Sequence, residues 1–138
     1  QILRLSGIYS NQNNVLARLK TGNVKIIDKK NQFFSRIHVE DIANILFKSL
    51  KNFKAKEIYN VSDDMPTLSK ELILYGSKLL NIEIPKVINL STIESEMVKN
   101  FYKDSKKVDN KKMKFFFNYK LKYPTYVEGL DYIFNNSI

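Results

Sequence analysis

The amino-acid sequence predicts an α/β fold. Short apolar runs closed by polar clusters, which are typical of strands, alternate with segments whose apolar residues recur at helical spacing. No internal repeat or low-complexity linker divides the 138 residues, and 43% of them are apolar, enough to build one core. We therefore expect strands and helices in alternation, followed by a mostly helical final part.

The chain begins with a strand and a short helix. Ile2–Tyr9 is an apolar run closed by the polar cluster Ser10–Asn14, which predicts a buried strand that leads into a loop. Val15–Lys20 predicts a helix that ends at Gly22, because glycine readily adopts the backbone conformation found after a helix C-terminus. Two further strands, separated by a polar turn, are expected at residues 24–28 and 33–38.

A helix that begins at Glu40 has the clearest signal. Acidic residues open it and lysines close it, as the helix dipole favours. Its apolar residues recur at helical spacing, namely Ile42, Ile45, Leu46, Leu50 and Phe53. A strand at 57–61 then leads through the loop 62–66 into a helix from Thr67 to Leu80.

The final part is mostly helical. Residues 87–90 predict a short strand, and Ser91–Glu94 has the pattern of a capping box that opens a helix towards Tyr102. Another helix is expected at 109–117, and a second capping box at Thr125–Glu128 opens a terminal helix that reaches Phe134.

The composition excludes several classes of function. The chain has no cysteine and one histidine, which excludes disulfides, thiol catalysis and a zinc site built from His and Cys, so we expect no metal site. No apolar stretch approaches the roughly 20 residues that span a bilayer, and the N-terminus lacks a secretory signal. We therefore expect a soluble cytoplasmic protein with no membrane partner.

The net charge of +9 leaves two interpretations open. Clustered Lys and Arg can neutralise nucleic-acid phosphates, which would make the chain a stand-alone basic binding module, for example for RNA, without enzymatic activity. However, Lys, Asn, Ile, Phe and Tyr, which all use A/T-rich codons, make up 67 of the 138 residues, whereas Arg occurs three times. Codon bias explains the lysines better, so nucleic acid is the less favoured partner.

The glycines provide no site for a dinucleotide. The chain has four glycines, and none lies in a Gly-rich turn between a strand and a helix, where a backbone can approach a pyrophosphate. The first residue is Gln1 and not Met, so we expect the natural start of the protein to lie upstream.

Four segments carry a family resemblance. They are Leu3-Arg-Leu-Ser-Gly-Ile-Tyr9, Arg36-Ile-His-Val-Glu-Asp-Ile-Ala43, Ile58-Tyr-Asn-Val-Ser-Asp63, and Lys106-Lys-Val-Asp-Asn-Lys111 together with Tyr123-Pro-Thr-Tyr-Val-Glu-Gly-Leu130. In order and spacing they resemble the C-terminal half of the extended short-chain dehydrogenase/reductase family, the NAD(P)-dependent nucleotide-sugar epimerases, dehydratases and reductases. Two departures are mild: Ser10 stands where the family usually has Gly, and Phe117-Asn-Tyr119 replaces Leu-Gly-Trp.

The resemblance implies the fold and the function. The fold would comprise the C-terminal strands of a Rossmann-type parallel sheet and a small, mostly helical substrate-binding part, so that residues 1–138 form one substrate-side portion. The cofactor fingerprint and the catalytic Tyr-Lys pair would lie upstream, which leaves no catalytic residue in this chain. The intact protein would use NAD or NADP on a sugar or nucleotide-sugar-like substrate. Its partners would be the missing dinucleotide-binding half and, in a homo-oligomer, further copies of itself.

The resemblance also places candidate site residues on the first strand. Leu5 and Ser6 would lie by the nicotinamide ring of the cofactor, and Gly7 and Tyr9 by the substrate. Gly7 has no side chain where several epimerases carry a polar residue that holds the nucleotide, which argues against a UDP-sugar.

Arginine and histidine provide further substrate-binding candidates. Arg18 and Arg36 are candidates because a guanidinium can bind two oxygens of a phosphate, while Arg4 falls within the predicted strand. His38, the single histidine, can bind a sugar or phosphate, or can fix the turn from strand to helix by a hydrogen bond to the backbone.

Other chemically suggestive residues have a structural explanation. Glu40 and Asp41 are expected to cap their helix, and Asp63 and Asp64 to form either a turn or a ligand site after a strand. Tyr102 and Lys106 have the spacing of a catalytic pair, but they follow the wrong strand for the family and are expected to end a helix. The remaining aromatic cluster, which we expect to pack on the sheet, comprises Phe115, Phe116, Phe117, Tyr119, Tyr123 and Tyr126.

Overall fold

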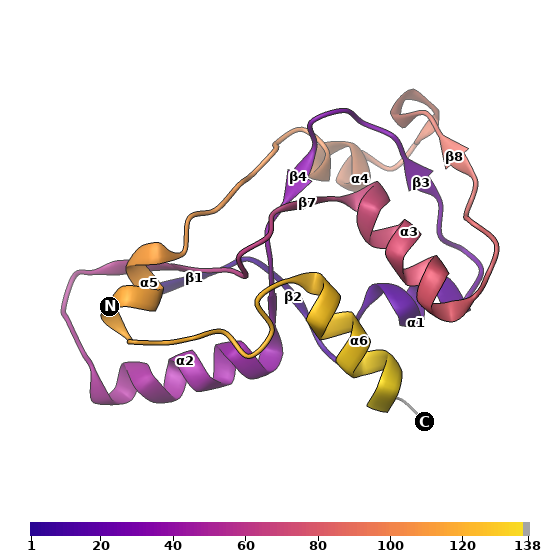
Figure 1. The fold of residues 1–138 in the computed structure, drawn as a ribbon. Coiled ribbons are helices and arrows are strands. Elements are labelled where there is room, and N and C mark those ends of the chain that lie inside the picture. The colour runs from indigo at the N-terminus through magenta and orange to yellow at the C-terminus, as the bar shows by residue number, and fades with distance from the viewer. Residues whose placement is uncertain (137–138) are drawn as a thin grey trace.

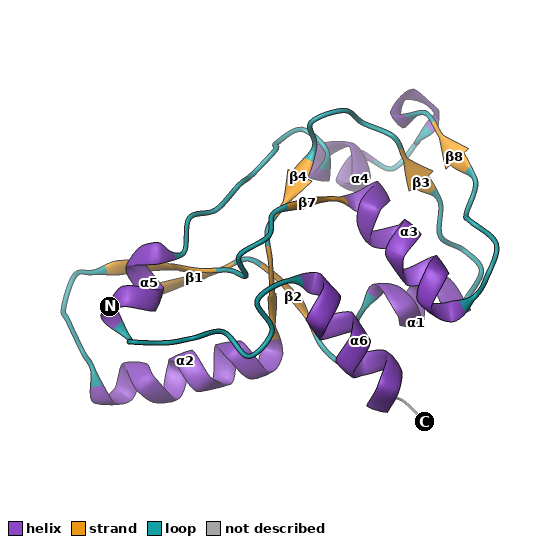
Figure 2. Ribbon diagram, viewed as in Figure 1, coloured by secondary structure: helices purple, strands orange, loops and turns teal. Residues whose placement is uncertain are grey.

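The computed structural model describes residues 1–136 and shows strands and helices in alternation (Figures 1 and 2). The strands are β1 Ile2–Leu5, β2 Gly7–Tyr9, β3 Ile26–Ile27, β4 Phe33–Phe34, β5 Arg36–His38, β6 Ile58–Val61, β7 Thr67–Leu68 and β8 Val87–Ile88. The helices are α1 Val15–Lys20, α2 Val39–Lys51, α3 Ser69–Leu80, α4 Glu96–Phe101, α5 Lys111–Phe116 and α6 Tyr126–Asn136, with a 3₁₀ turn at Leu90–Thr92. The predicted α/β class is confirmed.

The first apolar run forms two strands, and the prediction of one strand from Ile2 to Tyr9 was wrong. β1 pairs in parallel with β6, whereas β2 pairs in parallel with β5. The change of partner occurs at Ser6, whose backbone N–H donates to Val61 (3.0 Å), while the next N–H, that of Gly7, donates to Ser35 (3.1 Å). A single segment therefore joins two neighbouring parallel pairs.

The other strands are short, because each pairs over only two residues. β3 pairs in parallel with β8, and β4 pairs antiparallel with β7. Thr67 and Leu68, predicted as the start of a helix, belong to β7, and α3 begins after them at Ser69. The pairing of Phe34 with Thr67 explains this difference, because it holds both residues extended.

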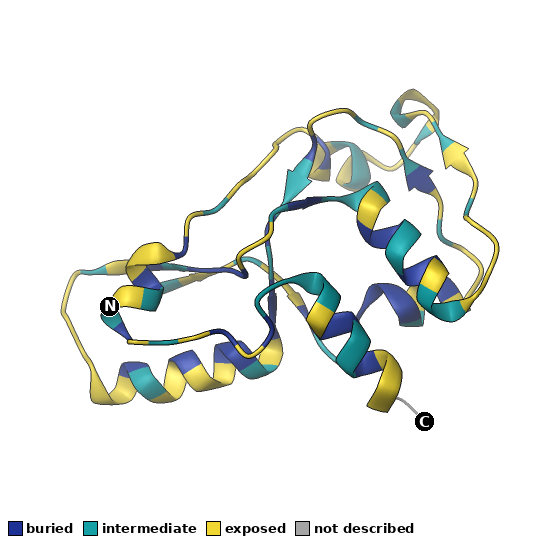
Figure 3. Cartoon of the chain, in the orientation of Figure 1, coloured by how far each residue is buried: buried dark blue, intermediate teal, exposed yellow. Residues whose placement is uncertain are grey.

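Two hydrophobic cores lie on the two sides of the molecule. The first packs α1, α3 and α6 over Tyr9 and Ile26, and the second packs α2 and α5 against β5 and β6 (Figure 3). In the second core Phe116 stacks on Tyr59 (4.8 Å between ring centroids) and Phe117 is buried, as expected for the aromatic cluster, but Phe115 is 91% exposed. The β2–β5 pair lies between the two cores (Figure 1).

Helix α2 buries one face and exposes another. Ile42 and Ile45 are buried as expected, but α2 ends at Lys51, before Phe53. Leu46, Leu50 and Phe53, also expected on the buried face, are 48%, 83% and 68% exposed. The helical spacing correctly placed Ile42 and Ile45 on the buried face, but it could not show that the rest of the fold leaves Leu46, Leu50 and Phe53 uncovered.

The segment between α3 and α5 has little core of its own. The capping box predicted at Ser91–Glu94 does not form; residues 90–92 make a 3₁₀ turn, and Ser95 caps α4. α4 buries no residue, and its last residue, Phe101, stacks on Phe34 (4.5 Å between ring centroids). The second predicted capping box does form, since Val127 N–H donates to Thr125 Oγ1 (3.1 Å) and Thr125 N–H donates to Glu128 (3.0 Å).

Candidate functional site

The candidate site lies on the β2–β5 pair. Gly7 is opposite Arg36 and Tyr9 is opposite His38, so these four residues share one face of the two-stranded sheet. Four of the five substrate-binding candidates are therefore neighbours. The fifth, Arg18, lies on the exposed surface of α1.

Tyr9 and His38 form the inner part of this face. Both are buried, and their rings pack edge to face at 5.0 Å. The Tyr9 hydroxyl has no hydrogen-bond partner within residues 1–136 and lies against Gly129 of α6, where an added Cβ would come within 2.0 Å of it. The hydroxyl is therefore covered by α6 and does not face solvent.

His38 fixes the turn from β5 into α2. Its Nδ1 accepts a hydrogen bond from the backbone N–H of Glu40 (3.3 Å), which makes it the N-cap of the helix. Its ring also packs on Tyr123 at 4.2 Å, and burial lowers the pKa of the imidazole. The structural role suggested by the sequence is thus present.

Gly7 and Arg36 form the outer part of the face. Gly7 is exposed, and an added Cβ would lie 3.3 Å from the Ser35 carbonyl oxygen and 3.9 Å from Arg36 Cγ. Arg36 is half-buried and donates from Nη1 to the Phe34 carbonyl (3.1 Å). Burial lowers the pKa of its guanidinium; the negative charge of Asp63 opposes this shift, and the positive charge of Arg18 adds to it.

The arginines take no part in ion pairs. Eight ion pairs occur within residues 1–136, and the cation in each is a lysine. Both Arg18 and Arg36 thus keep guanidinium donors available, and a guanidinium is suited to an oxyanion with two oxygens.

The sequence left the role of Asp63 open between a turn and a ligand site, and the structure places this residue beside Arg36. It follows β6, and its backbone N–H donates to the Arg36 carbonyl (2.6 Å). Its side chain is 1% exposed; Oδ1 accepts from Met65 N–H (3.1 Å), and Oδ2 has no partner within the described chain. Burial raises the pKa of Asp63 to about 7, although the Arg36 charge opposes this rise.

The neighbouring loop is held by paired groups. Asp64 forms an ion pair with Lys114 (2.9 Å), and the buried amide of Asn110 donates to Asp64 and to the carbonyls of Ser62 and Asp63. Asp63 therefore forms the expected turn and, in addition, keeps one carboxylate oxygen free.

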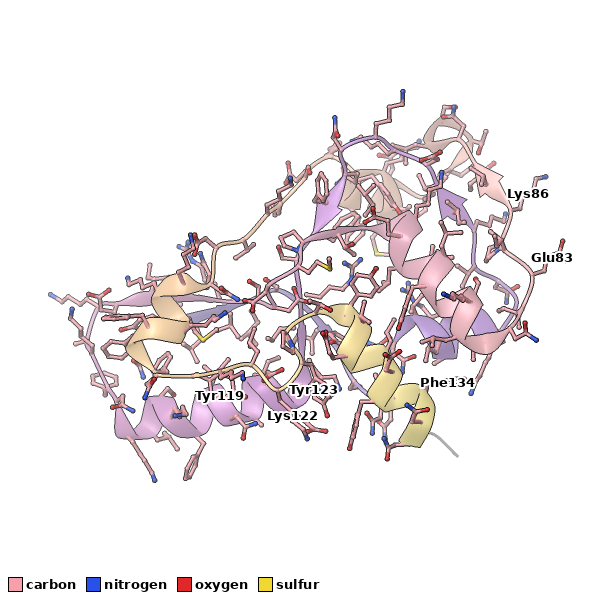
Figure 4. All side chains as sticks on the ribbon, in the orientation of Figure 1. Glu83, Lys86, Tyr119, Lys122, Tyr123 and Phe134 are labelled. Atoms are coloured by element: carbon pink, nitrogen blue, oxygen red, sulfur yellow. The ribbon has the colours of Figure 1, made fainter. Side chains whose placement is uncertain are left out.

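The structure corrects the expected role of Asp41. Its carboxylate does not cap α2, but accepts from Tyr119 Oη (2.6 Å) and from the backbone N–H groups of Lys122 (2.7 Å) and Tyr123 (3.1 Å). Glu40 pairs with Lys122 (2.5 Å), and Figure 4 shows Tyr119, Lys122 and Tyr123 along the segment that leads to α6. Both carboxylates thus hold the C-terminal segment on α2.

Tyr102 and Lys106 do not form a helical pair. α4 ends at Phe101, Tyr102 is its buried C-cap, and Lys106 lies in the extended segment that follows. The Lys106 backbone N–H donates to the Phe33 carbonyl (3.0 Å), and its ammonium pairs with Asp104 (3.6 Å). The geometry gives this pair no acid–base role; Tyr102 lies at a helix end as expected, whereas Lys106 lies beyond it.

The two residues expected near the cofactor lie beside the site. Leu5 is 44% exposed at the end of β1, and Ser6 is half-buried. Within residues 1–136, no group of three or more His, Cys, Asp or Glu side chains could hold a metal ion. In the same range no helix is long and apolar enough to cross a membrane.

Comparison with solved structures identifies the fold. A functionally unknown conserved protein from Silicibacter pomeroyi superposes with a TM-score of 0.90 at 35% identity, covering 95% of this chain and 47% of that protein. The human epimerase family protein with NADPH gives 0.80 at 17% identity (99% and 48% covered). The dTDP-glucose 4,6-dehydratase from Bacillus anthracis with NAD gives 0.74 at 16% identity (97% and 43% covered).

The chain has the fold of the C-terminal half of an extended short-chain dehydrogenase/reductase. It spans about half the length of the epimerase and dehydratase structures that it matches. No protein-family model and no curated protein matches the sequence.

Proposed function

We propose that this chain is the substrate-binding C-terminal portion of an NAD(P)-dependent oxidoreductase of the epimerase, dehydratase or reductase type. The observation that carries the proposal is the superposition of almost the whole chain on half of an NAD-bound dehydratase and half of an NADPH-bound epimerase family protein. Its substrate is a sugar or nucleotide-sugar-like molecule, as the name of the dTDP-glucose dehydratase suggests.

Two features of the surface support the proposal that a dinucleotide-binding half packs against this chain. β1 pairs along one edge only, with β6, so its other edge is free within the described residues to accept a further strand. Large apolar side chains are exposed along β1, β2 and α2, namely Ile2, Leu5, Ile8, Val39, Leu46 and Leu50. An upstream half that packs here would bury this surface and bring the cofactor fingerprint and the catalytic Tyr-Lys pair.

The residues at the end of β1 suit a nicotinamide ring. Leu5 presents an exposed apolar side chain, and the next residue, Ser6, is small. When bound, NAD or NADP supplies the acceptor or donor of a hydride. This chain contributes an apolar boundary for the ring and a surface that orients the substrate.

Three of the five candidate residues form the substrate-contacting surface in this proposal. Gly7 leaves the face open, and Arg36 and Arg18 hold an anionic group. Tyr9 and His38 lie behind them, where they support the face by packing. No proton-transfer residue is assigned within the chain.

The test uses the longer protein that we propose, obtained with the coding sequence upstream of Gln1. We expect it to purify with NAD or NADP, and we expect nucleotide sugars to change the absorbance of the bound nicotinamide. An Arg36→Gln variant should raise KM. The control variant Lys86→Gln, which changes an exposed residue directly before β8 (Figure 4), should leave KM unchanged. Absence of a bound nicotinamide and of turnover with every nucleotide sugar tested would overturn the proposal.

The alternative of an RNA-binding module receives less support. Eight of the 20 lysines are already paired with carboxylates in the described chain. RNA binding at physiological salt, with a steep dependence of log affinity on log salt concentration, would favour that alternative.

A further inference from the structure

His38 connects several parts of the chain through one buried imidazole ring. The ring lies at the end of β5, is 1% exposed, and caps α2 through Nδ1, which accepts from the backbone N–H of Glu40 (3.3 Å). It also packs against Tyr9 of β2 (5.0 Å between ring centroids) and against Tyr123 of the segment that leads to α6 (4.2 Å). A change in this one ring therefore reaches β2, α2 and the C-terminal segment.

The hydrogen bond from Glu40 requires a neutral imidazole. Because Nδ1 accepts this hydrogen bond, the neutral ring carries its proton on Nε2, which is buried and has no partner within residues 1–136. A second proton can bind only at Nδ1, where it would point at the Glu40 N–H and replace an acceptor by a donor. Protonation of His38 therefore breaks the cap of α2.

The position of the ring makes its charged form costly for two further reasons. The N-terminal end of a helix carries a partial positive charge that repels a cation, and α2 is a helix of 13 residues. Burial removes the water that would solvate the charge, which lowers the pKa of His38 from its ordinary value of 6.5. Tyr9 and Tyr123 provide no compensating charge, because burial raises the pKa of both hydroxyls.

The charged groups near His38 are already engaged with one another. Glu40 and Asp41 on α2 favour the charged ring, whereas Lys122, which precedes α6, opposes it. Glu40 pairs with Lys122 (2.5 Å), and Asp41 accepts three hydrogen bonds from the C-terminal segment. Neither carboxylate can turn to an imidazolium without giving up these partners.

The first turn of α2 is also where the C-terminal segment is attached. All three donors to Asp41, and the ammonium that pairs with Glu40, come from residues 119–123 (Figure 4). This segment continues into α6, whose Gly129 lies against Tyr9. Loss of the cap loosens the turn that holds the segment, and with it the cover over the inner part of the candidate face.

We propose that His38 is a pH-sensitive latch: when its imidazole takes up a proton, the cap of α2 breaks and residues 119–123 detach from Glu40 and Asp41, while the first core stays folded. The proton comes from solvent, binds Nδ1 and returns to solvent when the latch closes. The inference does not depend on the proposed function, because it concerns contacts within the chain and involves neither cofactor nor substrate.

The direction of the pH dependence follows from the lowered pKa of the closed form. In the open form the ring is solvated and has its ordinary pKa of 6.5. The closed form is therefore fully favoured above this value and is lost progressively as pH falls below it. The ratio of open to closed latch should rise by up to about tenfold per pH unit, until the pKa of the closed form is reached.

The experiment measures amide hydrogen exchange of the 138-residue chain by NMR at about pH 7.5 and about pH 5. The backbone N–H groups of Lys122 and Tyr123 report on the latch, because both donate to Asp41, and those of Ile73 and Ser77 on α3 report on the first core. After correction for intrinsic rates, opening of the latch relative to α3 should increase at least about threefold at the lower pH, with an upper limit of about thirtyfold. A smaller increase would overturn the inference.

Variants separate the proton from the cap. His38→Asn provides a side-chain oxygen that can cap a helix but does not titrate, so its latch should open to the same extent at both pH values. His38→Ala lacks a cap and should open more than the wild-type chain at about pH 7.5. Asp63 and the other carboxylates titrate in all three chains and cancel from the comparison. The wild-type pH dependence in His38→Asn would show that another group operates the latch.

A direct titration of the ring needs no variant, because His38 is the single histidine of the chain. Its imidazole C–H signals should change with a midpoint below pH 6.5, and the amide signals of Lys122 and Tyr123 should change with the same midpoint. A midpoint at or above pH 6.5 would contradict the latch. So would a ring that becomes charged while these two amides keep their chemical shifts, which is the result that a purely structural cap predicts.

Discussion

Replacement of Asp63 by asparagine should change how the stability of the chain depends on pH. The pKa of Asp63 is raised to about 7 in the folded state, compared with an ordinary value of 3.8. The fold therefore prefers the protonated acid, and the free energy of unfolding falls as pH rises from about 4 through about 7. Between about pH 5 and pH 8 the loss at this one group is roughly 2 to 3 kcal/mol.

The asparagine side chain cannot lose a proton, so the Asp63→Asn variant avoids this loss. The difference in free energy of unfolding between the variant and the wild-type chain should therefore shift in favour of the variant by roughly 2 to 3 kcal/mol from about pH 5 to about pH 8. Urea denaturation followed by circular dichroism at both pH values measures the difference. Asp28→Asn, which removes a half-exposed carboxylate paired with Lys70, should show little change with pH. An Asp63→Asn effect that is the same at both pH values would refute the reasoning.

Four further changes test the packing around the site. Tyr9→Phe removes a buried hydroxyl that lacks a partner and should raise the free energy of unfolding by about 1 kcal/mol; a loss of that size would show that the hydroxyl is hydrogen-bonded. Gly129→Ala places a methyl group 2.7 Å or less from Tyr9 side-chain atoms and should cost at least about 2 kcal/mol in thermal denaturation, unlike the exposed control Asn135→Ala. Asp41→Asn leaves a buried N–H group facing an amide and should cost about 3 kcal/mol; an unchanged denaturation midpoint would contradict this. Ile8→Lys should reduce self-association of the isolated chain in light scattering, and a monomeric wild-type chain would count against the exposed apolar surface as its cause.

Local signals predicted the helices better than the strands. α1 has the predicted bounds, and α6 begins one residue after Thr125, because caps and apolar spacing act within a few residues. The break at Ser6 could not be predicted, because it depends on β5 and β6, which lie about 30 and 55 residues further along the chain. Likewise, β7 is extended because it pairs with Phe33 and Phe34, which the sequence around Thr67 does not reveal.

The candidate site was predictable only in part. The family resemblance placed Gly7, Tyr9 and His38 on strands whose pairing brings them together with Arg36. The burial of Asp63 and the covering of the Tyr9 hydroxyl by α6 depend on contacts between distant segments, which spacing along the chain cannot show. Asp41 shows the same limit, because its position at the start of α2 favours a cap, whereas its partners lie near Tyr119 and Tyr123.

The contacts of Asp41 also set an order of events during synthesis. Its three donors lie 78 to 82 residues further along the chain, so the carboxylate at the start of α2 has none of them while the intervening segment is being made. A nascent chain that has not reached Tyr123 cannot bury this charge, and the second core stays open to water where α2 meets β5. Closure of that core is therefore a late step, and a ribosome-bound chain that stops short of Tyr119 should remain sensitive to proteases along α2.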